Sequence, residues 1–72
     1  ADEYFDADAT ELRLQQAILS LPKKQQLVFR LRYYDEMPYD QMSALTGTSE
    51  GALKASYHHA VNKVTDFLNQ QD

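Results

Sequence analysis

The chain has 72 residues, 43% of them hydrophobic and 25% charged, a composition that predicts one small folded domain and excludes a multi-domain enzyme. It contains no cysteine, which excludes a disulfide framework and a thiolate zinc site. No apolar run approaches the roughly 20 residues that span a bilayer. We therefore expect a cytoplasmic protein that does not insert into membranes.

The formal net charge of −4 argues against a nucleic-acid partner until the distribution of the charges is considered. Five acidic residues precede Arg13, the first basic residue, and the rest of the chain holds seven basic against six acidic residues. From Leu12 onward the charge is thus +1, which neither requires nor forbids a DNA partner. We expect residues 1–8 to be an acidic linker remnant that precedes a domain over 9–72; mimicry of DNA or guidance of a partner is the alternative.

The positions of glycine and proline, together with the helical periodicity between them, predict an all-α fold without a β-sheet. The two glycines and two prolines of the chain separate segments with helical periodicity, and no alternating run of branched and aromatic residues indicates a strand. The first helix is expected over residues 9–19, capped by Asp8 or Thr10. Its apolar positions include Leu12, Ile18 and Leu19.

Two proline-initiated helices are expected next, over residues 22–34 and 38–45. In the first of them an apolar stripe is predicted at Leu27, Val28 and Leu31. In the second the predicted stripe is Tyr39, Met42 and Leu45.

Residues 46–48 predict a tight turn between two helices. Gly47 can adopt the left-handed conformation that ends a helix, and Thr48 or Ser49 can cap the helix over residues 49–69. At about 100° per residue, the inward positions of that helix are Leu53, Tyr57, Ala60, Val64 and Phe67 or Leu68. The opposite face carries Gly51, Lys54, Ala55, His58 and Asn62.

A short helix, a glycine turn and a second helix with a small, polar outward face are typical of a helix-turn-helix motif. The second helix of such a motif enters the major groove, so its leading outward positions must be small or able to form hydrogen bonds. Gly51 and Ala55 permit close approach, and Lys54 lies between them. Lys54 is expected to contact a phosphate or a base edge, and Ala55 either a thymine methyl group or nothing.

The order and spacing of these residues resemble region 4 of bacterial RNA polymerase sigma factors of the extracytoplasmic-function group. The resemblance covers about residues 12–68. It is carried by Leu21-Pro22, Gln25, Val28-Phe29, Leu31-Arg32, Tyr39, Met42, Leu45, Gly47, Ser49, Gly51, Leu53-Lys54, His58 and Ala60. Residues 50–60 are similar to the variant found in sigma factors of the Bacteroidetes type.

This resemblance implies a four-helix domain that reads the minus-35 promoter element in double-stranded DNA and docks on the flap of the polymerase β subunit. It also implies control by an anti-sigma protein, often membrane-bound. The implied DNA-facing positions of the last helix are Lys54, Ala55, His58 and His59, and the implied phosphate contacts are Arg32, Tyr39, Thr48 and Ser49.

The chain also departs from that family. Many members carry arginine at the positions of Gln26, Ser56 and His59, and Glu36 takes the place of a common glycine. These changes reduce the expected affinity for DNA more than they affect the fold.

Other functions find little support in the residues. Because His58 and His59 point about 100° apart and no cysteine or well-spaced carboxylate accompanies them, no metal site is expected. A charged histidine near phosphates would tighten DNA binding as the pH falls. No nucleophile, phosphate-binding loop or buried carboxylate pair indicates an enzyme or a cofactor. The alternative to a DNA-binding domain is a helical module that docks on the polymerase flap or an anti-sigma protein with little DNA contact.

Overall fold

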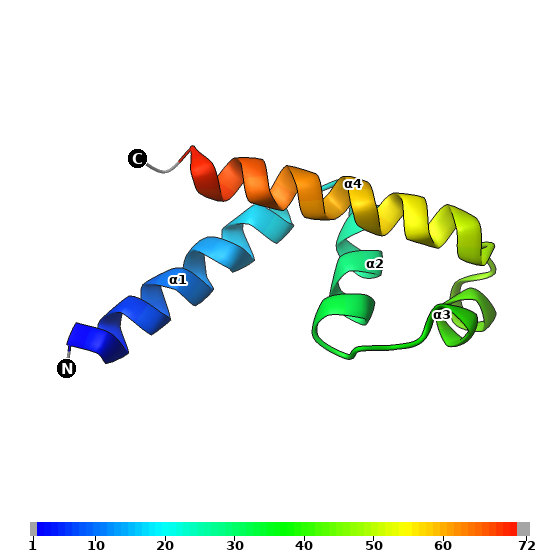
Figure 1. The fold of residues 1–72 in the computed structure, drawn as a ribbon, viewed down its shortest axis with the longest axis horizontal. Coiled ribbons are helices and arrows are strands. Elements are labelled where there is room, and N and C mark those ends of the chain that lie inside the picture. Colours follow the sequence, from blue (N-terminus) through cyan, green and yellow to red (C-terminus); the bar gives the residue numbers. More distant parts are fainter. Residues whose placement is uncertain (1, 71–72) are drawn as a thin grey trace.

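The structure is a computed structural model that describes the backbone of residues 2–70 and the side chains of residues 9–70. Within this part of the chain it contains no strand, and the all-α prediction is confirmed (Figure 1). Its helices are α1 (Asp2–Leu19), α2 (Lys23–Tyr33), α3 (Tyr39–Thr46) and α4 (Glu50–Asn69).

The start of α1 differs from the prediction. The helix begins at Asp2 rather than near residue 9, so the predicted cap at Asp8 or Thr10 is wrong, because both residues lie inside the helix. Acidic residues are favoured not only at the capping position but also throughout the first turn, where they face the positive end of the helix dipole. The division into a linker over 1–8 and a domain over 9–72 stays a prediction.

The two prolines stand just before their helices. Pro22 and Pro38 are the N-cap residues of α2 and α3, with ψ angles of 150° and 149°. Each helix therefore begins one residue later than predicted. The restricted φ of proline suits this position, and its missing N–H leaves one donor fewer to satisfy at the helix start.

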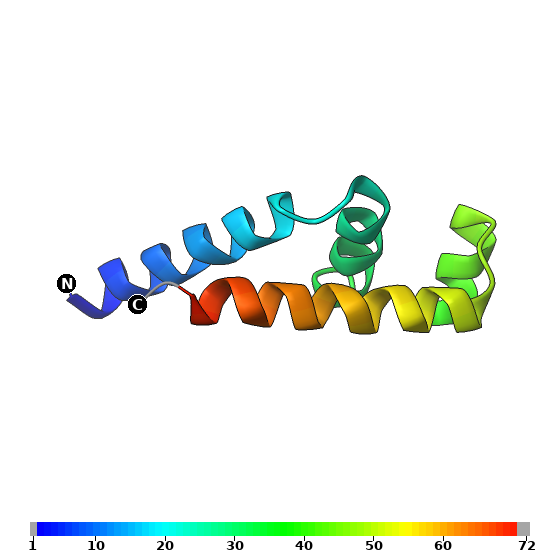
Figure 2. The same ribbon diagram turned by 90° about the horizontal axis from the view of Figure 1, so that it is seen from above.

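Helix α4 is the long element on which the other three pack (Figures 1 and 2). One buried cluster joins α1 and α2 to the carboxyl-terminal half of α4 through Ala17, Ile18, Leu21, Phe29, Ala60 and Val64. A second joins α2 and α3 to the amino-terminal half of α4 through Val28, Leu31, Met42 and Leu53. Tyr57 packs against both clusters, so the packing of α4 is continuous along its length.

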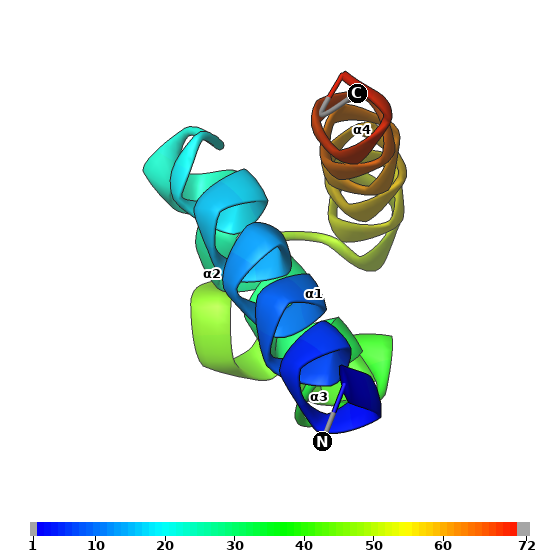
Figure 3. The same ribbon diagram turned by 90° about the vertical axis from the view of Figure 1, so that its left-hand side faces the viewer.

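Helices α1 and α4 form the two arms of a V whose free ends are the termini of the chain (Figure 1). Viewed along the long axis, both arms point toward the same end of the molecule and α3 lies behind them (Figure 3). Arg13 Nη2 donates a hydrogen bond to the carbonyl oxygen of Leu68 at 2.9 Å and links the arms. Within residues 2–70, no helix has the length and apolar character needed to cross a membrane.

The predicted apolar stripes are partly wrong. Ile18, Val28, Leu31 and Met42 are buried as expected, but Leu12, Leu19, Leu27 and Leu45 are at least half exposed. On α2 the three consecutive apolar residues 27–29 span about 200° of the helix, so they cannot all face the interior. Phe29, which the predicted stripe omitted, is buried instead of Leu27.

Candidate nucleic-acid interface

The turn between α3 and α4 has the predicted construction. Gly47 ends α3 with φ 74° and ψ 13°, a left-handed conformation that suits glycine because it has no Cβ. The Gly47 N–H donates to the carbonyl oxygen of Ser43 at 2.9 Å, and the Thr48 N–H donates to Thr46 Oγ1 at 3.2 Å. Both hydrogen bonds tie the turn to the end of α3.

Of the two predicted caps, Ser49 is the one used. Its Oγ accepts a hydrogen bond from the Ala52 N–H at 3.2 Å, while Thr48 precedes it in the turn. The Ser49 oxygen is engaged in the cap, but its hydroxyl proton can still be donated to a phosphate oxygen. Thr48 and Ser49 thus lie together at the amino-terminal end of α4.

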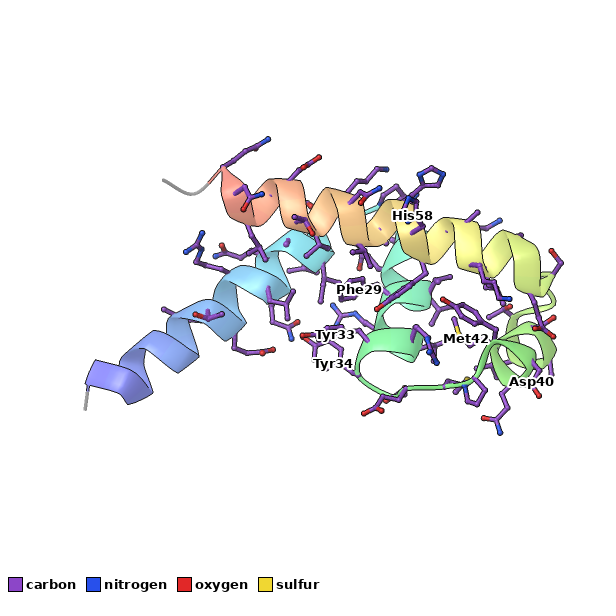
Figure 4. The ribbon with its side chains drawn as sticks, viewed as in Figure 1. Phe29, Tyr33, Tyr34, Asp40, Met42 and His58 are labelled. Carbon is purple, nitrogen blue, oxygen red and sulfur yellow. The ribbon has the colours of Figure 1, made fainter. Side chains whose placement is uncertain are left out.

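Helix α3 crosses α4 at a steep angle, as a helix-turn-helix motif requires (Figures 1 and 2). The face of α4 that points away from the interior is exposed along its whole length, as predicted. Its exposed residues are Gly51, Lys54, Ala55, His58 and Asn62. His58 points out into solvent, in contrast to the buried Phe29 and Met42 (Figure 4). This face is open to a partner as large as duplex DNA.

Three predicted residues from three helices meet at one aromatic ring. The guanidinium carbon of Arg32 on α2 lies 4.9 Å from the ring centroid of Tyr39, the first residue of α3. Lys54 Nζ on α4 lies 5.6 Å from the same centroid. Arg32 Nη1 also donates to the carbonyl oxygen of Met37 at 3.0 Å. Both distances are typical of cation–π contacts, so the structure gathers two basic side chains at the start of α3.

The charges of Arg32 and Lys54 are not neutralised by any side chain that the structure describes. Among the side chains at 9–70, no carboxylate forms an ion pair with either of them. Two unpaired cations of like charge repel each other, and a partner that brings negative charge relieves this repulsion. These two side chains, here called the cation cluster, are therefore suited to an anion such as a phosphate.

The two histidines do not form a common site. Their ring centroids are 6.1 Å apart, and His58 Nε2 lies 3.3 Å from Asn62 Nδ2 on its own helix. His59 is also exposed, but it projects about 100° round the helix from His58. Within the described residues, no group of three His, Cys, Asp or Glu side chains is placed to hold a metal ion.

Tyr57 contributes to the packing beneath this surface. It is half-buried, with its ring 5.7 Å from that of Phe29. Burial raises the pKa of its phenol, the electrostatic effect of Tyr39 raises it further, and Arg32 opposes the shift. The phenol therefore stays neutral, which agrees with the predicted packing role.

Two further features of the structure were not anticipated from the sequence. The first is a polar network between α1 and α2, in which Tyr34 Oη donates to Glu11 Oε2 at 3.1 Å and Gln15 Nε2 donates to the same oxygen at 2.8 Å. Burial first, and then Glu11, raises the pKa of Tyr34. The only sequence signal was the spacing of four between Glu11 and Gln15.

The second feature is a pair of apolar hollows. One of about 240 Å³ lies between α1, α2 and α4 and is lined by Leu14, Phe29, Tyr33, Val61, Leu68 and neighbouring side chains. The other, of about 540 Å³, lies beside the exposed Leu27 and Leu45. Neither is visible in the sequence, because each depends on how the helices pack.

A comparison with known protein families gives one match. The family model described as Sigma-70, region 4 matches residues 11–64, about three quarters of the chain. No curated protein and no solved structure is significantly similar to the chain. The matched segment contains the turn, the cation cluster and the exposed face of α4 as far as Asn62.

Proposed function

Because the chain belongs to the sigma-70 region 4 family, we propose that it reads the minus-35 element of promoters within an RNA polymerase sigma factor. In this role it acts without catalysis, by positioning the polymerase for transcription initiation. Its place of action is then the bacterial cytoplasm, where promoter and polymerase meet.

The observation that carries this proposal is the exposed outward face of α4 next to two unpaired cations. A major groove about 12 Å wide admits an α-helix, provided that its leading side chains are small or polar. Gly51 and Ala55 are both exposed and small, and Lys54 lies between them. The face therefore combines room for close approach with a positive charge at the edge that borders Tyr39.

We assign two kinds of contact to this surface. Ala55, His58 and Asn62 face the base edges, where sequence is read by hydrogen bonds and apolar contacts. Contacts to the phosphate backbone fix the orientation of the helix and carry no sequence information. Their candidates are Arg32, Lys54, Thr48, Ser49 and, at the side of α4, His59, while the ring of Tyr39 lies against Arg32 and Lys54.

A binding selection on randomised duplexes tests the proposal, with the chain fused to the flap segment of the polymerase. The parent is compared with Lys54→Glu and with Lys63→Glu. Residues 54 and 63 are both exposed, and they lie nine positions apart, which places them about 180° apart around α4. The two variants therefore have the same net charge and differ only in the face that they change.

The expected result is that the parent and Lys63→Glu enrich a common sequence, whereas Lys54→Glu enriches none. Equal loss in both variants would show that binding depends on net charge alone. Enrichment by Lys54→Glu of the parental sequence would remove the outward face of α4 from the interface.

We propose a second role for the apolar hollow between α1, α2 and α4, namely docking of the polymerase β flap. An anti-sigma protein that occupied the same hollow would block this docking. The supporting observation is that Leu14, Phe29, Tyr33, Val61 and Leu68 surround a concave, largely apolar space, and an apolar segment with few polar contacts fits such a surface.

A pair of variants on α1 tests this docking. Leu14→Gln changes the hollow, and Leu12→Gln changes an exposed leucine two positions away, which points about 200° from Leu14. Leu14→Gln should weaken binding to the isolated flap segment while Leu12→Gln does not. Equal affinities for both variants, with unchanged helicity by circular dichroism, would refute docking at this hollow.

A further inference from the structure

Tyr39 occupies the point where α2, α3 and α4 converge. Its ring centroid lies 4.9 Å from the guanidinium carbon of Arg32 and 5.6 Å from Nζ of Lys54. The residue is half-buried, and its ring also packs against the buried cluster of α2, α3 and α4. The ring is thus anchored in the fold, whereas the two cations reach it on long side chains from other helices.

Such long side chains are disordered by default. Holding a lysine or arginine in one conformation costs side-chain entropy, and like charges also resist being brought together. The negative face of an aromatic ring attracts both cations and offsets these costs. No carboxylate among the described side chains does so in its place.

The two cations are held to different degrees. Arg32 has a second anchor, because its Nη1 donates to the Met37 carbonyl oxygen at 3.0 Å. For Lys54 the ring of Tyr39 is the contact that the structure provides. Loss of the ring should therefore free Lys54 more than Arg32.

We infer that Tyr39 is a positioning residue, whose ring rather than its hydroxyl holds Arg32 and Lys54 in place for the DNA phosphates. The consequence for DNA rests on the proposed function, whereas the arrangement of the side chains does not. If the Tyr39 hydroxyl instead contacted a phosphate directly, removal of the hydroxyl alone would weaken binding.

The first test uses the free 72-residue chain and needs no DNA. Protons beside an aromatic ring face are shifted upfield, so the side-chain methylene protons of Lys54 and Arg32 should resonate upfield of their values in unstructured peptides. Tyr39→Phe should retain these shifts, and Tyr39→Leu should abolish them, most completely for Lys54. Absence of the shifts in the parent would overturn the inference, whatever the variants do.

The second test measures affinity for the duplex found by the selection described above. Tyr39→Leu should weaken binding about 3- to 10-fold, since both cations lose their support, and Tyr39→Phe should stay within about 2-fold of the parent. In the Lys54→Met background, Tyr39→Leu should cost less than it does alone, because one of the supported cations is already absent. Equal losses for Tyr39→Phe and Tyr39→Leu would assign the role to the hydroxyl and overturn the inference.

Controls separate the possible failures. Circular dichroism melting shows whether Tyr39→Leu remains folded, and if it does not, the resonances of the parent and of Tyr39→Phe decide the question alone. A parent that shows the upfield shifts but selects no duplex overturns the proposed DNA function and supports the arrangement at Tyr39. A parent that binds DNA but lacks the upfield shifts supports the proposed DNA function and overturns the positioning role of Tyr39.

Discussion

Replacing Gly51 by alanine is expected to raise the stability of the fold and to weaken DNA binding at the same time. Gly51 lies in the first turn of α4, and a Cβ built on it meets no atom within 4 Å. Its φ angle is not positive, so alanine fits without strain. A compatible Gly→Ala change adds about 0.4–1 kcal/mol to the free energy of unfolding.

Gly47 provides a matched control on the other side of the turn. A Cβ at Gly47 also meets nothing within 4 Å, but its φ of 74° is one that residues with a side chain rarely adopt. Gly47→Ala should therefore lower the free energy of unfolding by about 1 kcal/mol. The same methyl group in the same open space has opposite effects at the two glycines, because only the backbone conformation differs.

Thermal unfolding followed by circular dichroism measures the stability part. For a domain of this size, 1 kcal/mol corresponds to about 4–8 °C, so Gly51→Ala should raise Tm by about 2–8 °C and Gly47→Ala should lower it by about 4–8 °C. A fall in Tm for Gly51→Ala would refute the assignment of Gly51 as an unstrained helical position in open space.

Fluorescence anisotropy with a labelled duplex measures the binding part, at a temperature where all variants are folded. If α4 enters the groove with its amino-terminal end leading, the added methyl group at Gly51 overpacks the interface and costs about 1–3 kcal/mol, or at least about 5-fold in Kd. Gly47→Ala should change Kd little once folding is complete. Parental affinity for Gly51→Ala would refute close approach of this end of α4.

Three further predictions concern single side chains. Lys54→Ala should reduce the slope of log K against log salt by about 0.9 if the ammonium contacts one phosphate, whereas Lys63→Ala should leave the slope unchanged. Glu36 has a φ of 51° in the connection between α2 and α3, so Glu36→Gly should add about 0.5–1 kcal/mol to the free energy of unfolding in urea. No gain would show that the left-handed backbone carries little cost there. The pKa of Tyr34 is raised by burial and by Glu11, so the folded state favours the neutral phenol. This contribution to stability is complete below about pH 10 and is lost as the pH rises through the folded-state pKa, and urea titrations should show a smaller alkaline decline for Tyr34→Phe.

The helices could be predicted where a local signal leaves no alternative. Gly47 and the two prolines mark boundaries because their backbone chemistry is restricted, and Glu36 departs from a common glycine at the one position where a non-glycine residue has a positive φ in the described chain. The start of α1 was missed because an acidic residue that is suited to cap a helix can also lie inside one, as Asp8 does in the second turn of α1. A residue type locates the end of a helix only when it is disfavoured inside the helix, as glycine and proline are and an acidic residue is not.

The interface could be predicted only along a single helix. The periodicity of 100° per residue predicts which residues of α4 face outward, and these residues are exposed in the structure. The meeting of Arg32 and Lys54 on Tyr39 could not be predicted, because it depends on the angles between three helices. The exposure of Leu45 has the same cause, since the packing of α3 decides which side of its apolar stripe is covered.

The arrangement of charge explains how an acidic chain can present a surface for DNA. The amino-terminal end of α1, which carries most of the acidic residues before Arg13, lies at the opposite end of the molecule from the turn between α3 and α4 (Figures 1 and 2). The molecule is 43 Å long, whereas electrostatic interactions through physiological salt decay over about 8 Å. The repulsion between the acidic end and a duplex near the turn is therefore screened. The proposed interaction then depends on the charges close to it, which are Arg32 and Lys54 together with the exposed Asp40 and Glu50. The net charge of −4 describes the whole chain and not the surface proposed to meet the phosphates.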